Sequence, residues 1–517
     1  MRFLLMFSGL LLTAALAAQP RPPAFLEHPT RWADSVLATL TPDERIAQLI
    51  MVAAYSNRDE AHQAEIERLV REQKIGGLVF FQGGPGRQAR LTNRYQAAAD
   101  VPLLIAIDAE WGLIMRLDST VKFPYQMTLG ALPDDSLIYR MGRSLAAQCR
   151  RLGVHVNFAP VIDVNNNPAN PVINFRSFGE DRARVARKGV AYARGMQDGG
   201  LLTSAKHFPG HGDTDTDSHL ALPLISHGRR RLDSLELYPF RRVIDAGVAG
   251  IMVAHLSVPA LDTTAGRAST LSRAIVTDLL KGELGFRGLT FTDAMNMRAV
   301  ADHYPPGEAD ARALLAGNDV LEFTQDVAKT ISEVRRMIEA GTLTQAAVDA
   351  RCRKMLLAKA WVGLDHYAPV ALENLVEDLN PPAAAHLNRQ LFEGSLTALR
   401  NEGELLPLRD LSVRVASVSV GAGALTPFQR MLDRYTTVTH HTLPVDAPAA
   451  EVARVRAALR DHDVVLLGVH PPSVHPTRNY GLQDAFVRTV GDLVNDPDAP
   501  GRRTVVALFG NPYALPR

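Results

Sequence analysis

Short apolar runs, separated by amphipathic segments, recur along most of the chain. Eight of them lie at residues 46–54, 75–81, 102–108, 154–164, 201–207, 250–258, 289–293 and 319–323. Most of the intervals between them carry apolar residues at helical spacing. One such segment contains Leu137, Met141 and Leu145, has Asp134 or Asp135 as its expected N-cap, and ends at Gly153. Apolar runs of this length are typical of strands buried on both faces, and their alternation with helices predicts a parallel sheet.

Eight strand and helix units within residues 30–365 predict an N-terminal (β/α)8 TIM-type barrel. An open doubly wound sheet is the alternative, although eight units of this size would be large for one open sheet. Barrel enzymes place their sites at the C-terminal ends of the strands. The polar residues that close the apolar runs are therefore the ones to consider: Asp108, Asp163, Lys206, His207, His255 and Asp293.

A second unit is expected after the barrel. Residues 366–385 contain three prolines and are predicted to be a linker. Residues 386–517 then carry four further apolar runs, at 413–420, 436–443, 464–469 and 504–509, with helical stretches between them. They predict a smaller α/β sandwich domain. The sequence stops where another helix and strand would be expected, so this domain is predicted to be incomplete.

Composition and charge narrow the classes of protein and of partner. The 517 residues are 46% hydrophobic and 21% charged, as in a soluble globular protein. Lys and Arg (56) nearly balance Asp and Glu (55), so the formal charge of +1 argues against nucleic acid or an anionic membrane surface as partner. The two cysteines, Cys149 and Cys352, are expected to be buried thiols, with a single bridge as the alternative.

The first residues have the features of a secretory signal peptide. Arg2 precedes an apolar run at 3–12, and small residues follow at 14–18. We expect residues 1–18 to be removed by cleavage after Ala17 or Ala18, and the mature protein to be periplasmic or extracellular. The apolar run is shorter than the roughly 20 residues of a spanning helix, and no other segment is predicted to span a membrane.

The densest cluster of titratable side chains lies at residues 206–219, KHFPGHGDTDTDSH. Asp217 and His219 are two residues apart, so in an extended turn both can project to one side. A carboxylate beside an imidazole fixes its tautomer and raises its basicity, which would let the pair donate and accept a proton. The alternative is that His219 only hydrogen-bonds within its own loop.

Metal binding is the other interpretation of this cluster. Asp213, Asp215 and Asp217 alternate as in a calcium loop, but Ser218 stands at the glycine position and Leu224 at the glutamate position. A zinc site from His207, His211 and His219 is a further alternative, without an HExxH pattern to support it. We therefore expect no metal and no other cofactor.

Asp293 follows the alternating segment LTFT and would point into the mouth of a barrel. A carboxylate there can attack an electrophilic carbon, hold a metal, or cap the following helix. Lys206, His207, Asp108 and Arg176 supply cations, a neutral donor and a carboxylate at the ends of other strands. Their joint placement favours a polyhydroxylated substrate, because such groups pair with neighbouring hydroxyls.

Several of these motifs together resemble glycoside hydrolase family 3, specifically its bacterial β-N-acetylglucosaminidase (β-hexosaminidase) branch. They are IDAEWG, NFRSFGED, KHFPGHG followed by DTDTDSH, and FTDAMNM, and the resemblance covers about residues 30–365. NDVLEF at 318–323 and NEGELLPL at 401–408 are further family landmarks, the second of which lies beyond the barrel.

The resemblance implies a retaining, two-step mechanism. Asp293 would be the nucleophile that forms a covalent glycosyl-enzyme, and His219, paired with Asp217, would be the acid and then the base. The residues that would bind sugar hydroxyls are Asp108, Arg176, Lys206 and His207, with Arg116 carried over from the arginine that follows the aspartate. The family's double-glycine segment reads Glu-Trp-Gly here, a departure that concerns contacts near Trp111.

The expected activity is exo-acting removal of terminal β-linked N-acetylglucosamine from peptidoglycan or chitin-type fragments. Three alternatives stay open. A β-glucosidase of the same fold would favour an aryl glucoside over an aryl N-acetylglucosaminide. A phosphorylase would form a sugar 1-phosphate, since a neutral imidazole does not repel phosphate as a carboxylate would. A catalytically silent glycan-binding barrel would keep its properties when Asp293 is replaced.

Overall fold

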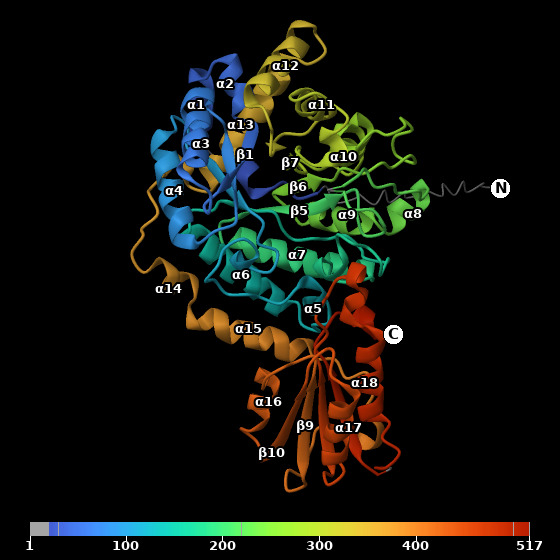
Figure 1. Ribbon diagram of the computed structural model, residues 1–517. Helices are drawn as coiled ribbons and strands as arrows, with labels where there is room; N and C mark the ends of the chain where they lie inside the picture. Colours follow the sequence, from blue (N-terminus) through green and yellow to red (C-terminus); the bar gives the residue numbers. More distant parts are fainter. Residues whose placement is uncertain (1–19, 29, 219, 500, 516–517) are drawn as a thin grey trace, which may run out of the picture.

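The computed structural model describes residues 20–515 apart from 29, 219 and 500. Residues 1–18, the predicted signal peptide, and His219, the predicted acid and base, lie outside the described residues. The described chain forms a large barrel unit and a smaller sheet unit at one side of it (Figure 1). Helix α15 (Pro382–Ser395) lies against barrel helices α5 (Gln126–Gly130) and α6 (Ser136–Arg151) and leads from one unit to the other.

The larger sheet has eight parallel strands in the order β7-β6-β5-β4-β3-β2-β1-β8. A parallel bridge between Phe291 and Val320 links the two ends of this order, so the sheet closes into a barrel. Each strand lies within, or one residue beyond, one of the eight apolar runs, and the predicted barrel is confirmed. The strands are β1 (Ile50–Tyr55), β2 (Gly77–Phe81), β3 (Leu104–Ile107), β4 (Val156–Asn157), β5 (Leu202–Phe208), β6 (Gly250–Val253), β7 (Leu289–Thr292) and β8 (Leu321–Glu322).

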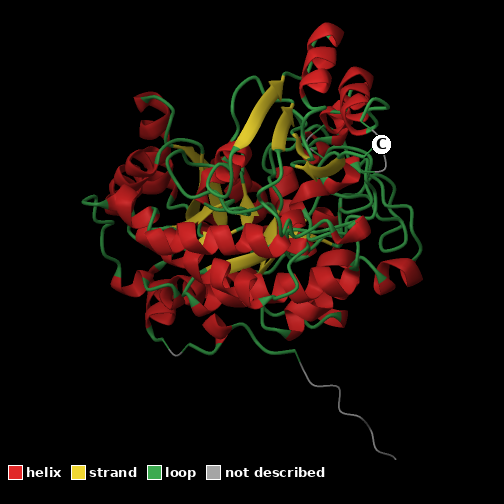
Figure 2. Ribbon diagram, turned by 90° about the horizontal axis from the view of Figure 1, so that it is seen from below, coloured by secondary structure: helices red, strands yellow, loops and turns green. Residues whose placement is uncertain are grey.

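Helices surround these strands (Figure 2). In chain order they are α1 (Trp32–Thr39), α2 (Pro42–Ala47), α3 (Glu60–Gln73), α4 (Pro85–Ala98), α5, α6, α7 (Arg182–Asp198), α8 (Arg229–Ser234), α9 (Leu237–Asp245), the π-helix η5 (Ala274–Glu283), α10 (Arg298–Ala301), α11 (Glu308–Ala316), α12 (Val327–Glu339) and α13 (Gln345–Trp361). The predicted start of α6 is explained by Asp134, whose carboxylate accepts from the Ser136 amide at 2.8 Å. The helix ends two residues before Gly153, as expected.

The smaller sheet is also parallel, with strand order β10-β9-β11-β12. Its strands are β9 (Val415–Val420), β10 (Val438–Leu443), β11 (Val464–Val469) and β12 (Arg503–Leu508). Alternate residues of the strands face opposite sides, so one face packs against α16 (Pro427–Leu432) and the other against α17 (Ala449–Ala458) and α18 (Asp484–Val494). The predicted second α/β unit is confirmed. Residues 366–385, predicted as a linker, include α14 (Leu375–Leu379) and the first turn of α15.

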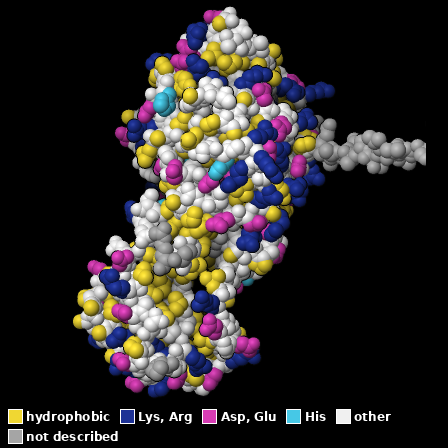
Figure 3. Space-filling model, turned by 90° about the vertical axis from the view of Figure 1, so that its right-hand side faces the viewer, with side chains coloured by type: hydrophobic (Ala, Val, Ile, Leu, Met, Phe, Trp, Pro, Cys, Tyr) yellow, Lys and Arg dark blue, Asp and Glu magenta, His cyan; other side chains and the backbone are white. Residues whose placement is uncertain are grey.

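Other expectations from composition can be compared with the structure. Cys149 and Cys352 are both buried free thiols. Acidic and basic side chains are interspersed on the face in Figure 3, where hydrophobic side chains gather at the narrowing between the two units. Within the described part of the chain, no helix combines the length and the apolar character needed to cross a bilayer.

The two units meet at the segment between β4 and α7. The Tyr513 hydroxyl donates to the Asn165 carbonyl at 2.8 Å, and the Tyr480 hydroxyl donates to the Pro168 carbonyl. The Asn511 side-chain amide donates to Asn174 Oδ1 at 2.6 Å. The smaller unit therefore contacts the barrel two residues before Arg176, at the end where the site residues gather.

Candidate active site

The barrel mouth contains a connected set of buried charges that starts at β3. Asp108 follows the last residue of β3, and its carboxylate contacts Arg116 at 2.6 Å and Lys206 Nζ at 2.7 Å. Burial alone would raise the pKa of Asp108, but the charges of Lys206 and Arg116 outweigh it and lower that pKa. Asp108 is thus an ionised acceptor at the end of the strand, as its predicted contact with sugar hydroxyls requires.

Glu110 extends this set, although the sequence did not single it out. Its fully buried carboxylate accepts from Arg176 Nε at 2.9 Å and Nη2 at 2.6 Å, and lies 2.9 Å from Lys206 Nζ. Burial would raise the pKa of Glu110, but Arg176 and Lys206 bring it down to about 2. The same two carboxylates, Asp108 and Glu110, raise the pKa of Lys206 against the effect of its burial. Lys206 and Arg176 are therefore fixed as cations.

A third carboxylate, Asp163, fixes the segment that follows β5. It accepts from the backbone amides of His207 (3.1 Å) and His211 (2.7 Å), and from His207 Nδ1 at 2.7 Å. Since ionised Asp163 only accepts, His207 Nδ1 carries the proton of this hydrogen bond. His207 Nε2 lies 3.4 Å from Arg176 Nη2. Asp163 therefore sets the orientation of His207.

The structure thus brings together five predicted sugar-binding residues, Asp108, Arg116, Arg176, Lys206 and His207. Three cations (Arg116, Arg176, Lys206) lie among three carboxylates (Asp108, Glu110, Asp163). Each cation forms an ion pair with Asp108 or Glu110. Asp163 joins the set through His207, which lies next to Arg176. A rigid arrangement of donors and acceptors with little net charge suits a neutral, polyhydroxylated ligand, because every group is oriented before the ligand arrives.

The loop after His207 is organised by His211. Its Nδ1 lies 2.8 Å from the Thr214 hydroxyl and its Nε2 lies 3.2 Å from the Ser218 hydroxyl. Burial lowers the pKa of His211 to about 4, so the ring is neutral near pH 7. Ser218 stands between Asp217, which is half-buried, and His219, which lies outside the described residues. The predicted pairing of Asp217 with His219 therefore stays a prediction.

The histidine set considered for zinc is otherwise occupied as far as the described residues extend. His207 and His211 each use ring nitrogens in the contacts given above. A different group able to hold a metal ion is formed by Asp213 of this loop with His227 and Glu236, which follow it in the chain. The Arg231 guanidinium lies there, 3.2 Å from Glu236 and 3.6 Å from Asp213, and supplies a positive charge to both carboxylates.

Asp293 directly follows β7 and is half-buried. Its Oδ1 accepts from the Ala294 amide at 2.8 Å, and its own amide donates to the Val253 carbonyl at 2.9 Å. The next helix, α10, begins at Arg298 with Met297 at its N-cap. Asp293 is therefore not the cap of that helix, which removes the structural alternative considered for it. His255 supports the same segment, since its Nε2 lies 3.1 Å from the Ala294 carbonyl.

Glu322, at the end of β8, is a buried carboxyl group inside the same barrel mouth. It is 2% exposed, and no hydrogen-bond partner for its Oε1 exists among the described residues. Burial, with the charges of Asp108 and Asp293, raises its pKa well above the ordinary value. Glu322 thus favours its protonated form and adds no further negative charge beside Asp293.

This raised pKa predicts a specific pH dependence of stability. The folded protein retains a proton on Glu322 that the unfolded chain releases, so Glu322 should lower the free energy of unfolding progressively as pH rises above the ordinary carboxyl pKa, by up to about 1.4 kcal/mol per pH unit. Glu322→Gln mimics the protonated group. The variant should gain stability relative to the natural protein between pH 4 and 8, measured by urea denaturation.

Glu65→Gln is the matched control for that series. Glu65 is exposed, and its hydrogen bond to Arg68 lowers its pKa, so its contribution is lost as pH falls and has the opposite sign. A stability difference between Glu322→Gln and the natural protein that does not change with pH would show that Glu322 ionises normally in the folded state.

Comparison with known proteins adds evidence of a different kind. The family model described as "Glycosyl hydrolase family 3 N terminal domain" matches residues 41–358. The chain is 34% identical over 378 residues to beta-hexosaminidase A of Pseudoalteromonas piscicida, covering 67% of this chain and 62% of that protein, so it spans less than two thirds of that relative's length. It is 32% identical to beta-hexosaminidase LpqI of Mycobacterium tuberculosis, covering 64% of this chain and 87% of that one.

A solved structure matches both units. It is a glycoside hydrolase family 3 beta-N-acetylglucosaminidase from Paenibacillus sp. str. FPU-7, with 31% identity, 92% of each chain covered and a TM-score of 0.75.

Proposed function

Because the chain belongs to glycosyl hydrolase family 3, we propose that it is a retaining, exo-acting β-N-acetylglucosaminidase. Its substrates would be fragments of peptidoglycan or of chitin type that end in β-linked N-acetylglucosamine. The relatives named beta-hexosaminidase support an N-acetylhexosamine such as N-acetylglucosamine as the sugar that is released. The observation that carries the proposal is the buried network of Asp108, Glu110, Lys206 and Arg176 at the mouth of the barrel that also holds Asp293, at the end of β7.

In the proposed first step, Asp293 attacks the anomeric carbon of the terminal sugar. The bond from that carbon to the leaving oxygen breaks, and His219 gives this oxygen a proton. In the second step, His219 takes a proton from water as the water oxygen attacks the same carbon and releases Asp293. Two displacements on one carbon retain its configuration. Asp108, Lys206, Arg176 and His207 hold the sugar hydroxyls throughout.

The proposal predicts a clear choice between two substrates that differ only at the sugar C2 substituent. An aryl β-N-acetylglucosaminide should be hydrolysed with a kcat/KM at least about 100-fold above that of the matching aryl β-glucoside. The reason is that contacts of the protein with the acetamido group stabilise the transition state, and the glucoside lacks this group. Initial rates of aryl release measure both. A preference for the glucoside would instead support a β-glucosidase, and the release of neither aglycone would support the glycan-binding alternative.

Export is part of the proposal and rests on residues 1–18. A secreted enzyme would meet cell-wall fragments directly. N-terminal sequencing of the protein recovered outside the cytoplasm should begin after Ala17 or Ala18, and a sequence that begins at Met1 would contradict cleavage.

A further inference from the structure

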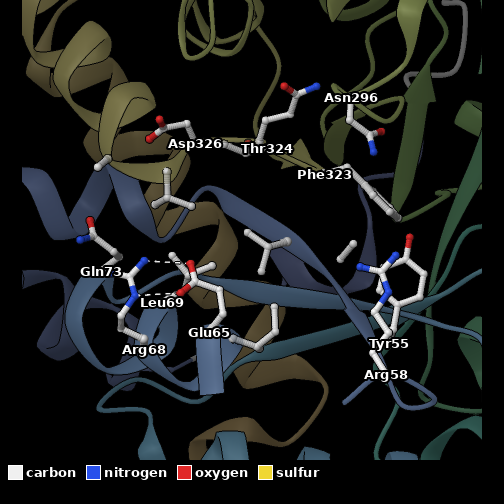
Figure 4. A pocket seen from close by; sticks show the side chains of 16 residues that line it. Tyr55, Arg58, Glu65, Arg68, Leu69, Gln73, Asn296, Phe323, Thr324 and Asp326 are labelled. Atoms are coloured by element: carbon white, nitrogen blue, oxygen red, sulfur yellow. Dashed lines mark hydrogen bonds and ion pairs between the residues drawn. The ribbon is translucent and has the colours of Figure 1, made fainter. Parts of the chain in front are cut away.

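A pocket of about 560 Å³, shown in Figure 4, opens at the C-terminal ends of β1 and β8. We call it the β1–β8 pocket. Parts of β1 and α3 line it, as do the segment after Asp293 and the start of α12. The lining residues that matter most for its chemistry are Tyr55, Arg58, Leu69, Asn296, Phe323 and Asp326.

Aromatic rings join this pocket to the predicted sugar-binding residues. Phe323 packs edge-on against Phe81 at 5.4 Å between ring centroids, and Tyr55 lies 5.8 Å from the same ring. The Arg116 guanidinium lies 3.7 Å from the centroid of Phe81 and forms the ion pair with Asp108. The pocket is therefore one aromatic side chain away from the residues expected to hold the terminal sugar.

The pocket also adjoins the predicted nucleophile. Asn296, three residues after Asp293, lines it. Between them, the Met295 amide donates to the Glu322 carbonyl at 2.8 Å, which ties this segment to the end of β8, next to Phe323. A group that leaves a sugar held by Asp108 and attacked by Asp293 would have a hollow of suitable size within reach on this side of the barrel.

Two arginines line the pocket, and they differ in how their charge is used (Figure 4). Arg68 contacts Glu65 at 2.8 Å and Glu72 at 3.2 Å, so two carboxylates already neutralise it. Arg58 instead lies over the ring of Tyr55, at 3.6 Å from its centroid. No carboxylate among the described residues forms an ion pair with Arg58, which leaves its planar donors available to a ligand.

We propose that the β1–β8 pocket binds the leaving group of the substrate and selects a leaving group that carries a carboxylate, with Arg58 as the residue that binds the anion. This inference rests on the proposed function and names its substrate class more closely. Tyr55 and Phe323 supply apolar faces for the ring of the leaving group, and Tyr55 holds the Arg58 guanidinium in place. Arg58 acts on binding and specificity and takes no part in bond breaking.

The first test compares two substrates that differ only in charge, the 4-carboxyphenyl and 4-carbamoylphenyl β-N-acetylglucosaminides. The natural protein should prefer the carboxylate in kcat/KM, and Arg58→Gln should reduce that preference about tenfold, the size of one charge-assisted hydrogen bond. Arg68→Gln is the matched control, since Arg68 lines the same pocket with its charge already neutralised. An equal loss of preference in both variants would overturn the assignment to Arg58.

The second test does not depend on turnover. The corresponding 1-thioglycosides resist hydrolysis, and their dissociation constants can be measured by calorimetry with the whole protein. The carboxylate should bind more tightly than the carboxamide to the natural protein and to Arg68→Gln, and about equally to Arg58→Gln. Equal affinity of the natural protein for the two ligands, including no affinity for either, overturns the inference.

The two proposals fail separately. Selective binding of the carboxylate thioglycoside without hydrolysis of any aryl N-acetylglucosaminide would contradict the proposed activity and support the assignment of the pocket. Hydrolysis without any preference for the carboxylate would keep the activity and sink the assignment of the pocket.

Discussion

Replacing Asp293 by alanine should abolish turnover while leaving the fold intact. The expected fall in kcat for an aryl β-N-acetylglucosaminide is about 10⁴-fold or more, because the variant lacks the group that attacks the anomeric carbon. Asp293 is half-buried at the end of β7, and its Oδ1 accepts from the adjacent Ala294 amide at 2.8 Å. We expect the apolar core of the barrel to stay folded without this carboxylate. Steady-state kinetics and thermal unfolding measure the two effects.

Asp302→Ala is a matched control, since Asp302 is an exposed carboxylate nearby in the chain that pairs only with Arg298 among the described residues. Added azide should partly restore turnover of the Asp293→Ala variant and give the α-glycosyl azide, because azide occupies the face that the carboxylate left. A fluorinated N-acetylglucosaminide should label Asp293 in the natural protein. Unchanged turnover in Asp293→Ala, or a label on another residue, would refute the assignment.

Glu110→Gln should have the largest effect on stability. Glu110 is fully buried and neutralises Arg176 and Lys206, so its replacement leaves two buried cations with less compensation. We expect the free energy of unfolding to fall by about 3–5 kcal/mol, as when one partner of a buried ion pair is removed. A loss of about 100-fold in kcat/KM should accompany it where the protein remains folded, because Arg176 and Lys206 lose their orientation.

The Glu65→Gln variant controls for the chemistry of that substitution. Glu65 also binds an arginine through both oxygens, at 2.9 and 2.8 Å, but both partners are exposed to water and salt. Its effect on urea denaturation should be much smaller. If the two variants were equally stable, the buried network would not depend on Glu110, and the orientation of Arg176 would need another explanation.

The strands were predictable because their signal is local. A strand buried on both faces is mostly apolar, and the apolar runs predicted even β4 and β8, which have only two residues each. Their second residues, Asn157 and Glu322, are buried polar exceptions. Pro381 and Pro382 were less informative, because they predicted a linker without regular structure. Helix α15 instead begins at Pro382, since proline is well tolerated in the first turn of a helix.

The site was predictable only in part, because its partners are distant in sequence. Asp108, Lys206 and His207 were identified by chemistry and by their positions at strand ends, and Arg176, which the structure places in the 3-10 helix Asn174–Arg176, by its chemistry. Glu110 was missed because its role depends on Arg176, which lies 66 residues away, and becomes visible only when the barrel closes. The available signal was that Glu110 lies two residues after Asp108. Residues two apart can project to the same side of an extended segment, which is the reasoning that linked Asp217 to His219. Asp163 was identified at a strand end, but its hydrogen bonds to the His207 and His211 backbone amides could not be predicted from the sequence.

The contact between the two units has a thermodynamic consequence. Tyr513 and Asn511 of the smaller unit hydrogen-bond Asn165 and Asn174, in the segment that leads to Arg176. If docking of the smaller unit orders Arg176 for a ligand, reciprocity requires that an occupied site strengthen the docking by the same factor. A bound ligand would then strengthen the association of the two units, and they would unfold more cooperatively with the ligand than without it.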